Sequence, residues 1–142
     1  IRENVKSVFL CSRATAKVMI EQKKGNIISI ASVAGLRAYL DNIAYGAAKA
    51  GIINLTKTLS VNLAPYNIRV NAIAPGYIAT SGVLQMQKDM PTERMQKRLD
   101  FIPLHRLGQP KEIVGGVIYL ASDASSYVTG ETLLIDGGIT IG

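Results

Sequence analysis

The sequence predicts an α/β fold built on a parallel β-sheet. Segments with a helical spacing of apolar residues alternate along the 142 residues with short, apolar, β-prone segments. Such alternation indicates strands joined by helical crossovers, which place neighbouring strands parallel. Hydrophobic residues make up 48% of the chain and charged residues 18%, proportions that favour a packed globular body. The length suits one domain and is too short for two.

Three long helices are expected from apolar side chains that recur with the period of a helix. A Lys-Lys-Gly sequence follows the first helix, a proline follows the second, and a proline opens the third. These residues are ordinary helix stop and start signals. The three helices are expected over residues 3–22, 43–64 and 110–122.

Three strands are expected, each a short apolar run bounded by turn residues. Pro75-Gly76 follows the second run, and Asp136-Gly137-Gly138 closes the third. The strands are expected over residues 26–31, 68–73 and 132–136.

The segment of residues 77–104 is the least regular part of the chain. It mixes apolar and charged positions, and Met90-Pro91-Thr92 divides it into two short helices, because a residue before proline avoids the helical conformation. Loops at the carboxyl ends of parallel strands hold the binding sites of α/β folds. The segment is therefore either a cover over a site or a plain surface excursion.

Tyr45 and Lys49 lie four residues apart in the second expected helix and so project from the same face. A phenol has an ordinary pKa of about 10 and exchanges protons poorly at neutral pH. A neighbouring ammonium group favours the phenolate and lowers that value, which suits general acid/base catalysis. The pair predicts proton transfer, although a packing tyrosine beside a solvated lysine has the same spacing.

Three further segments accompany this pair in a fixed order. They are Gly25-Asn-Ile-Ile-Ser-Ile-Ala-Ser-Val-Ala-Gly35, Ile68-Arg-Val-Asn-Ala-Ile-Ala-Pro-Gly76 and Gly130-Glu-Thr-Leu-Leu-Ile-Asp-Gly-Gly138. Ser32 precedes Tyr45 by thirteen residues, and Asn4 precedes Ser32 by twenty-eight. Together these features closely resemble the short-chain dehydrogenase/reductase family, in its single-domain branch with a Tyr-x-x-x-Lys active site. The resemblance covers nearly the whole chain.

The resemblance implies a doubly wound parallel-sheet Rossmann fold. Residues 1–142 would form the C-terminal, catalytic portion of a single Rossmann-type domain, with residues 77–104 as the substrate lid. The family's Gly-rich turn, Thr-Gly-x-x-x-Gly-x-Gly, which holds the cofactor pyrophosphate at a helix N-terminus, does not occur in the sequence. We therefore expect the N-terminal Gly-rich half, about a hundred residues, to be missing from this chain, and the 142 residues alone to be inactive.

The chemistry implied by the resemblance is hydride transfer between a nicotinamide, NAD or NADP, and a carbonyl or secondary alcohol. Tyr45 would be the general acid/base, and Lys49 would assist it and hold the nicotinamide ribose. Ser32 would hydrogen-bond the substrate oxygen. Asn4 would hold a water that links Lys49 to solvent, although an N-cap is the alternative role for an asparagine at a helix start.

Four residues around the Pro-Gly turn are expected to bind the cofactor together with Tyr45 and Lys49. Proline ends the strand, and glycine lets the backbone approach a ligand closely. By resemblance, two residues beyond the turn contact the carboxamide. The four residues are Pro75, Gly76, Ile78 and Thr80.

The implied substrate is a small carbonyl or secondary alcohol, with 3-oxoacyl thioesters and sugars or polyols equally similar. One alternative is an extended-type epimerase or dehydratase, which also uses Tyr-x-x-x-Lys; the short Pro-Gly loop and the closing Asp-Gly-Gly argue against it. The other alternative is a non-catalytic remnant or interaction fragment of such an enzyme, because the pyrophosphate-binding turn is missing.

The remaining composition bears on partners and compartment. The formal net charge is +6, but the basic residues crowd the first helix without interleaved aromatic residues, so we expect a solvated face and no nucleic-acid partner. The longest uncharged apolar run, residues 113–121, is far below the ~20 residues that span a bilayer, so no membrane partner is expected. By resemblance the protein is a homo-oligomer, a tetramer.

The single cysteine, Cys11, fits a reducing compartment and predicts a cytoplasmic protein. Its apolar surroundings in the sequence predict a small buried side chain. The single histidine, His105, is expected in a surface loop, and no metal site is expected because no group of Cys, His and carboxylate residues has ligand spacing.

Overall fold

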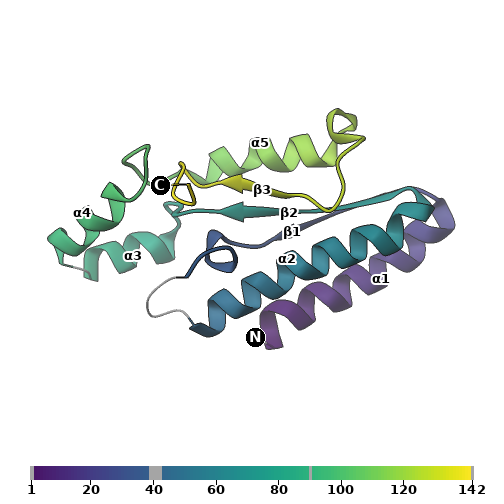
Figure 1. Cartoon of the computed structure of the whole chain (residues 1–142), viewed down its shortest axis with the longest axis horizontal. Helices are drawn as coiled ribbons and strands as arrows, with labels where there is room; N and C mark the ends of the chain where they lie inside the picture. The colour runs from purple at the N-terminus through teal and green to yellow at the C-terminus, as the bar shows by residue number, and fades with distance from the viewer. Residues whose placement is uncertain (1, 39–42, 90, 142) are drawn as a thin grey trace.

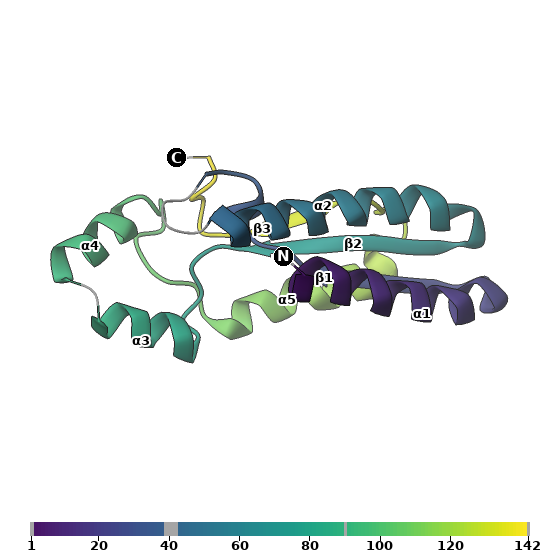
Figure 2. The same ribbon diagram turned by 90° about the horizontal axis from the view of Figure 1, so that it is seen from below.

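The computed structural model describes residues 2–38, 43–89 and 91–141. Three parallel strands form one sheet in the order β1-β2-β3, with β1 at Gly25–Ile30, β2 at Ile68–Pro75 and β3 at Thr132–Ile135. Helix α2 (Ile43–Leu63) and helix α5 (Pro110–Ala121) lie on opposite faces of this sheet (Figure 1). Helix α1 (Ser7–Gln22) runs beside α2 on the β1 side (Figure 2). The α/β class and the parallel sheet are therefore confirmed.

The central strand β2 is buried because helices cover both of its faces. Val70, Ala72 and Ala74 have no exposed surface, and the two alanines pack with Ile52 and Ile53 of α2. Successive side chains of a strand point to opposite faces. Ile73 accordingly lies near Gly116 of α5 on the other face.

The sequence located the long elements to within two residues, except for the start of the first helix. β1 begins one residue earlier than expected, and β2 continues two residues further, through Pro75, which pairs with Ile135 of β3. The first expected helix contains an irregularity that periodicity did not indicate: residues Arg2–Lys6 form a π-helical turn before α1 begins. π-Helical turns occur frequently at functional sites.

Residues 77–104, which we call the lid, contain two short helices as expected. Helix α3 covers Ser81–Asp89 and helix α4 covers Thr92–Asp100. Both lie beyond the carboxyl ends of the strands, where the lid forms a separate projection (Figure 1). Its inner side packs through Ile102, which is buried with Val33 and Ile139.

The prediction for Cys11 was wrong, because its side chain is exposed. Helix α1 packs instead through the next position, Ser12, and through Ala16 one turn later. Cys11 lines an open cavity of about 390 Å³ between α1 and β1. The apolar run was correctly identified as helical, but Cys11 lies on a side of α1 that the described residues do not bury.

Side-chain amide and guanidinium groups fasten the connection from α5 to β3 onto β2. The fully buried Asn71 donates from Nδ2 to the carbonyl of Val128 at 3.0 Å and accepts at Oδ1 from the backbone N–H of Glu131 at 3.0 Å. Arg69 donates to the carbonyls of Leu120 and Ser122 at 3.0 and 3.2 Å. These bonds satisfy backbone groups that have no partner in the short β3 ladder.

Within the described ranges, no helix is long and apolar enough to cross a membrane.

Candidate active site

Helix α2 begins at Ile43, so Tyr45 and Lys49 lie on successive turns at its N-terminal end. Lys49 Nζ lies 5.5 Å from the centroid of the Tyr45 ring and donates a hydrogen bond of 2.9 Å to the carbonyl oxygen of Ile30, at the end of β1. Lys49 is half-buried, and this burial lowers its pKa below the ordinary 10.5. An ammonium has three donors. The bond to Ile30 uses one of them and leaves two for the tyrosine oxygen and a ligand.

Ser32 lies immediately beyond β1, at the N-cap of a short 3₁₀ turn formed by Val33–Gly35. Its Oγ accepts a hydrogen bond of 3.2 Å from the backbone N–H of Ala34. Because this bond uses only an acceptor position, the hydroxyl proton of Ser32 remains available for another oxygen.

Two glycines let the Ser32 turn press against the start of α2. A Cβ added at Gly35 would lie 2.6 Å from the backbone nitrogen of Ala50 and from the carbonyl carbon of Lys49. A Cβ added at Gly46 would lie 3.0 Å from the carbonyl oxygen of Ala34. The absence of these side chains fixes the distance between the serine turn and the helix that bears Tyr45 and Lys49.

Ser32 and Tyr45 line the same cavity, which has a volume of about 170 Å³. The opposite wall comes from the loop after β2 and from the lid. The lining residues are Ser32, Val33, Ala34, Tyr45, Gly76, Tyr77 and Val83. Both hydroxyl groups therefore belong to side chains that a single small molecule can contact, and none of the described residues lining the cavity is a carboxylate.

Asn4 lies in the π-helical turn that precedes α1 and is half-buried. This turn packs against α2, with Val5 next to the position of Gly51, where an added Cβ would lie 3.1 Å from a Val5 methyl group. The carbonyl of Asn4 accepts a 3.0 Å hydrogen bond from Ser7 Oγ. The structure thus places Asn4 beside the helix of Lys49, inside an irregular turn.

Of the four residues around the Pro-Gly turn that are expected to bind cofactor, Pro75 is the last residue of β2 and the other three follow the strand. Gly76 lines the cavity of Ser32 and Tyr45, and its N–H donates to the carbonyl of Ile135 at 3.0 Å. An added Cβ at Gly76 would lie 2.8 Å from Asp136 Cα, so glycine is required here by the neighbouring strand exit. Sequence reasoning had explained this glycine only by the approach of a ligand.

Ile78 and Thr80 lie further along the same loop, outside the Ser32 cavity. Ile78 pairs with Gly108 in an isolated parallel bridge and lines a neighbouring cavity of about 100 Å³. Thr80 precedes α3, and its Oγ1 accepts from the N–H of Val83 at 3.4 Å, which leaves its hydroxyl proton free to donate.

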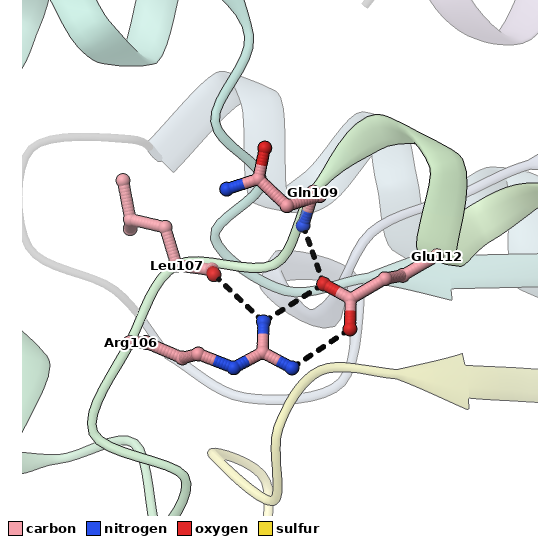
Figure 3. Close-up of polar contacts among 4 residues, drawn as sticks. All are labelled: Arg106, Leu107, Gln109 and Glu112. Carbon is pink, nitrogen blue, oxygen red and sulfur yellow. Dashed lines mark hydrogen bonds and ion pairs between the residues drawn. The ribbon is translucent and has the colours of Figure 1, made fainter.

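The loop that leads from the lid to α5 is held by an ion pair between Arg106 and Glu112 (Figure 3). Arg106 donates from both terminal nitrogens to the carboxylate of Glu112, at 2.8 and 2.7 Å, and the backbone N–H of Gln109 donates to the same carboxylate at 2.6 Å. The hydrogen bonds from Arg106 are the main cause that lowers the pKa of Glu112 to about 2. Glu112 thereby joins the loop before α5 to the first turn of that helix.

Sequence reasoning missed several residues of this region. Gln109 and Glu112 have capping-box spacing, a signal that was present in the sequence. Tyr77 and Val83 reach the cavity only through the path of the loop after β2, which no local pattern indicates. His105 lies in an exposed loop with a left-handed φ of 49°, which confirms the expectation of a surface histidine.

Comparisons with known proteins agree with this architecture. A family profile described as "Enoyl-(Acyl carrier protein) reductase" matches residues 1–140. A 3-oxoacyl-[acyl-carrier-protein] reductase of Synechocystis is 45% identical over 139 residues, which are 97% of this chain and 53% of that protein. The 2-dehydro-3-deoxy-D-gluconate 5-dehydrogenase of Escherichia coli is 43% identical over 136 residues, 95% of this chain and 53% of that protein.

Solved structures show the same likeness. A gluconate 5-dehydrogenase from Burkholderia cenocepacia, in complex with NADP and tartrate, superposes with a TM-score of 0.92 at 36% identity, over 98% of this chain and 54% of that one. A 3-oxoacyl-[acyl-carrier protein] reductase from Brucella melitensis superposes with a TM-score of 0.89 at 38% identity, over 98% of this chain and 51% of that one. The chain spans about half the length of the curated relatives it matches. It belongs to the short-chain dehydrogenase/reductase family.

Proposed function

We propose that the protein containing these residues is an NAD(P)-dependent oxidoreductase that interconverts a small carbonyl compound and a secondary alcohol. The observation that carries the proposal is the shared cavity of Ser32 and Tyr45, with the ammonium of Lys49 5.5 Å from the tyrosine ring. A hydroxyl that binds an oxygen, a phenol that exchanges a proton and a cation that favours the phenolate are the groups that this chemistry requires.

In the reductive direction, Ser32 donates its hydroxyl proton to the carbonyl oxygen and so stabilises the negative charge that develops there. Tyr45 then transfers its phenolic proton to the same oxygen. The positive charge of Lys49 stabilises the phenolate that remains, because the half-buried ammonium is less screened than one in open solvent. In the oxidative direction Tyr45 takes the proton from the alcohol.

The nicotinamide, when bound, supplies or accepts the hydride. The donors near the cavity fit its ribose and carboxamide: two unused donors on Lys49 and, beyond the cavity, the hydroxyl of Thr80. We assign Tyr45, Lys49, Pro75, Gly76, Ile78 and Thr80 to cofactor binding. Asn4 is assigned to a water-mediated path for protons to Lys49, supported by its place in the π-helical turn packed on α2.

The names of the relatives support a choice of substrate classes. Curated relatives include a 3-oxoacyl-[acyl-carrier-protein] reductase, an acetoacetyl-CoA reductase and a 2-dehydro-3-deoxy-D-gluconate 5-dehydrogenase. The cavity has room for the reacting carbonyl and its nearest carbons in either class of compound. We therefore propose 3-oxoacyl thioesters and sugar or polyol derivatives as the substrates to test.

The test is cofactor oxidation by the full-length protein with a panel of both substrate classes. Tyr45→Phe is expected to lower kcat by about 10²- to 10⁴-fold, the usual contribution of general acid/base catalysis. Tyr66→Phe is the matched control, because Tyr66 has nearly the same exposed fraction as Tyr45, 43% against 42%, and lies at the opposite end of α2. Full activity in Tyr45→Phe would refute the mechanism.

We also propose that the protein assembles as a homo-oligomer in the cytoplasm. The outward face of α5 supports assembly, since it exposes Val114, Val117 and Ile118 in adjacent turns. Ile118→Glu is expected to reduce the molar mass in solution, measured by light scattering after size exclusion. A mass unchanged by Ile118→Glu and by Val114→Glu would exclude this face as the interface.

A further inference from the structure

Arg98, on helix α4 of the lid, contacts groups of low polarity. Its guanidinium carbon lies 5.8 Å from the centroid of the Tyr77 ring, and its Nη1 lies 3.7 Å from the sulfur of Met86. The side chain is half-buried. A thioether is a weak acceptor, and a ring face does not occupy the in-plane N–H donors of a guanidinium. Most of the five donors therefore remain available.

Among the described residues, none of the lid carboxylates Asp89, Glu93 and Asp100 forms an ion pair with Arg98. Asp100 accepts a hydrogen bond of 3.0 Å from Gln96 on the same helix, and Asp89 accepts from Gln85 at 3.1 Å. Within the described ranges, the interactions of Arg98 are those with Tyr77 and Met86, and neither partner is acidic. A partly desolvated arginine without a counter-ion is poised to bind an anion.

Tyr77 connects Arg98 to the proposed reaction centre. Its side chain lines the cavity that also contains Ser32 and Tyr45. Arg98 therefore contacts a residue that also lines the cavity of Ser32 and Tyr45. None of the described residues that line the cavity is charged, so a charged group on a bound molecule would find its partner beyond them.

We infer that Arg98 binds an anionic group of the substrate, a carboxylate or a phosphate, that is remote from the reacting carbonyl, and so makes the enzyme selective for anionic carbonyl compounds. The inference rests on the proposed function. The contact with the Tyr77 ring restrains the guanidinium before the substrate arrives, which lowers the entropic cost of binding. Because the contact is the same before and during reaction, it acts mainly on KM.

The experiment uses two matched pairs of substrates with the full-length protein. Acetoacetyl-CoA is compared with the acetoacetyl thioester of N-acetylcysteamine, which has the same reacting carbonyl and no phosphate. 5-Keto-D-gluconate is compared with fructose, a ketose without a carboxylate. The variants are Arg98→Gln, Arg98→Lys and, as the matched control, Lys97→Gln on the exposed side of the same turn.

Arg98→Gln is expected to lower kcat/KM for the anionic member of one pair by about tenfold to a hundredfold, the loss of a charge-assisted hydrogen bond, with less than about a twofold effect on the neutral member. Loss in the thioester pair identifies a phosphate, and loss in the sugar pair identifies a carboxylate. Arg98→Lys is expected to retain part of the selectivity, and Lys97→Gln all of it. The KM of the anionic member should rise with salt in the wild type and much less in Arg98→Gln.

Equal losses for anionic and neutral members would show that Arg98 only supports Tyr77, and no loss in either pair would likewise overturn the inference. Both results leave the proposed function intact, since Tyr45-dependent turnover would persist. Absence of turnover of all four compounds by the wild-type protein would instead overturn the proposed function, and this inference with it.

Discussion

Lys49 Nζ lies 2.9 Å from the carbonyl oxygen of Ile30, which ties the start of α2 to the end of β1. The bond holds the ammonium between the strand that leads to Ser32 and the ring of Tyr45. Removal of the charge should therefore affect proton transfer directly. Lys49→Met is expected to lower kcat by about a hundredfold or more, with Lys57→Met, on an exposed face of the same helix, near wild type.

The pH profile provides a separate test of Lys49. Because burial lowers the pKa of Lys49 below 10.5, its proton is lost at a lower pH than that of a free lysine. In alcohol oxidation, loss of this charge removes the group that stabilises the phenolate, so kcat is expected to fall on the alkaline side below pH 10.5. The arginine of Lys49→Arg stays charged in this alkaline range, so this variant should keep a larger fraction of its maximal kcat there than the wild type keeps of its own. Identical alkaline limbs in both proteins would exclude Lys49 as the titrating group.

The close approach of Gly35 to α2 predicts a mutation that acts on the site without touching a ligand. Gly35→Ala would place a methyl group 2.6 Å from backbone atoms of Lys49 and Ala50, which must separate. We expect a loss of about 1–3 kcal/mol in the free energy of unfolding, typical of overpacking, together with a lower kcat. Gly115→Ala on α5 is the control, because its Cβ meets nothing within 4 Å.

The control should raise stability by up to ~1 kcal/mol, since alanine favours a helix more than glycine does. Chemical denaturation and initial rates measure both effects. A Gly35→Ala protein with wild-type kcat would show that the distance between the serine turn and α2 is not critical.

The Arg106–Glu112 pair predicts an acid-dependent contribution to stability. The pKa of Glu112 is lowered from 4.5 to about 2 in the folded protein, so the folded state favours the ionised carboxylate. The contribution is therefore complete above pH 4.5 and is lost as the pH falls toward 2. The difference in melting temperature between the wild type and Glu112→Gln is expected to shrink over this range. A constant difference between pH 7 and pH 3 would contradict the assignment.

The sequence predicted the parts of this structure that depend on local patterns. Apolar periodicity and Gly and Pro signals located the long helices and the strands, because burial on one face and chain termination are both local properties. The same holds for Tyr45 and Lys49, whose proximity follows from four residues of helix. Cys11 was misassigned because a continuous apolar run indicates a helix but does not say which of its sides faces inward.

Contacts between distant segments could not be predicted in this way. The placement of Tyr77 on the cavity wall depends on how the loop after β2 turns toward the pairing of Ile78 with Gly108. The bonds of Asn71 to Val128 and Glu131 join residues about sixty positions apart in the sequence. In the sequence, Asn71 is a polar residue within an otherwise apolar strand. Its burial is explained only by the path of the chain after α5, which supplies its hydrogen-bond partners.

The two walls of the Ser32 cavity have different origins, and this difference determines how such an enzyme can diverge. Backbone contact at Gly35 and Gly46 fixes the wall that bears Ser32 and Tyr45. The facing residues Tyr77 and Val83 belong to the lid, which is joined to the rest of the molecule through a few side chains and backbone hydrogen bonds. Under the proposed function, substitutions in the lid can therefore exchange one carbonyl compound for another while the proton chemistry stays unchanged. Redesign of specificity should begin at Tyr77, Val83 and Arg98 and leave the serine turn alone.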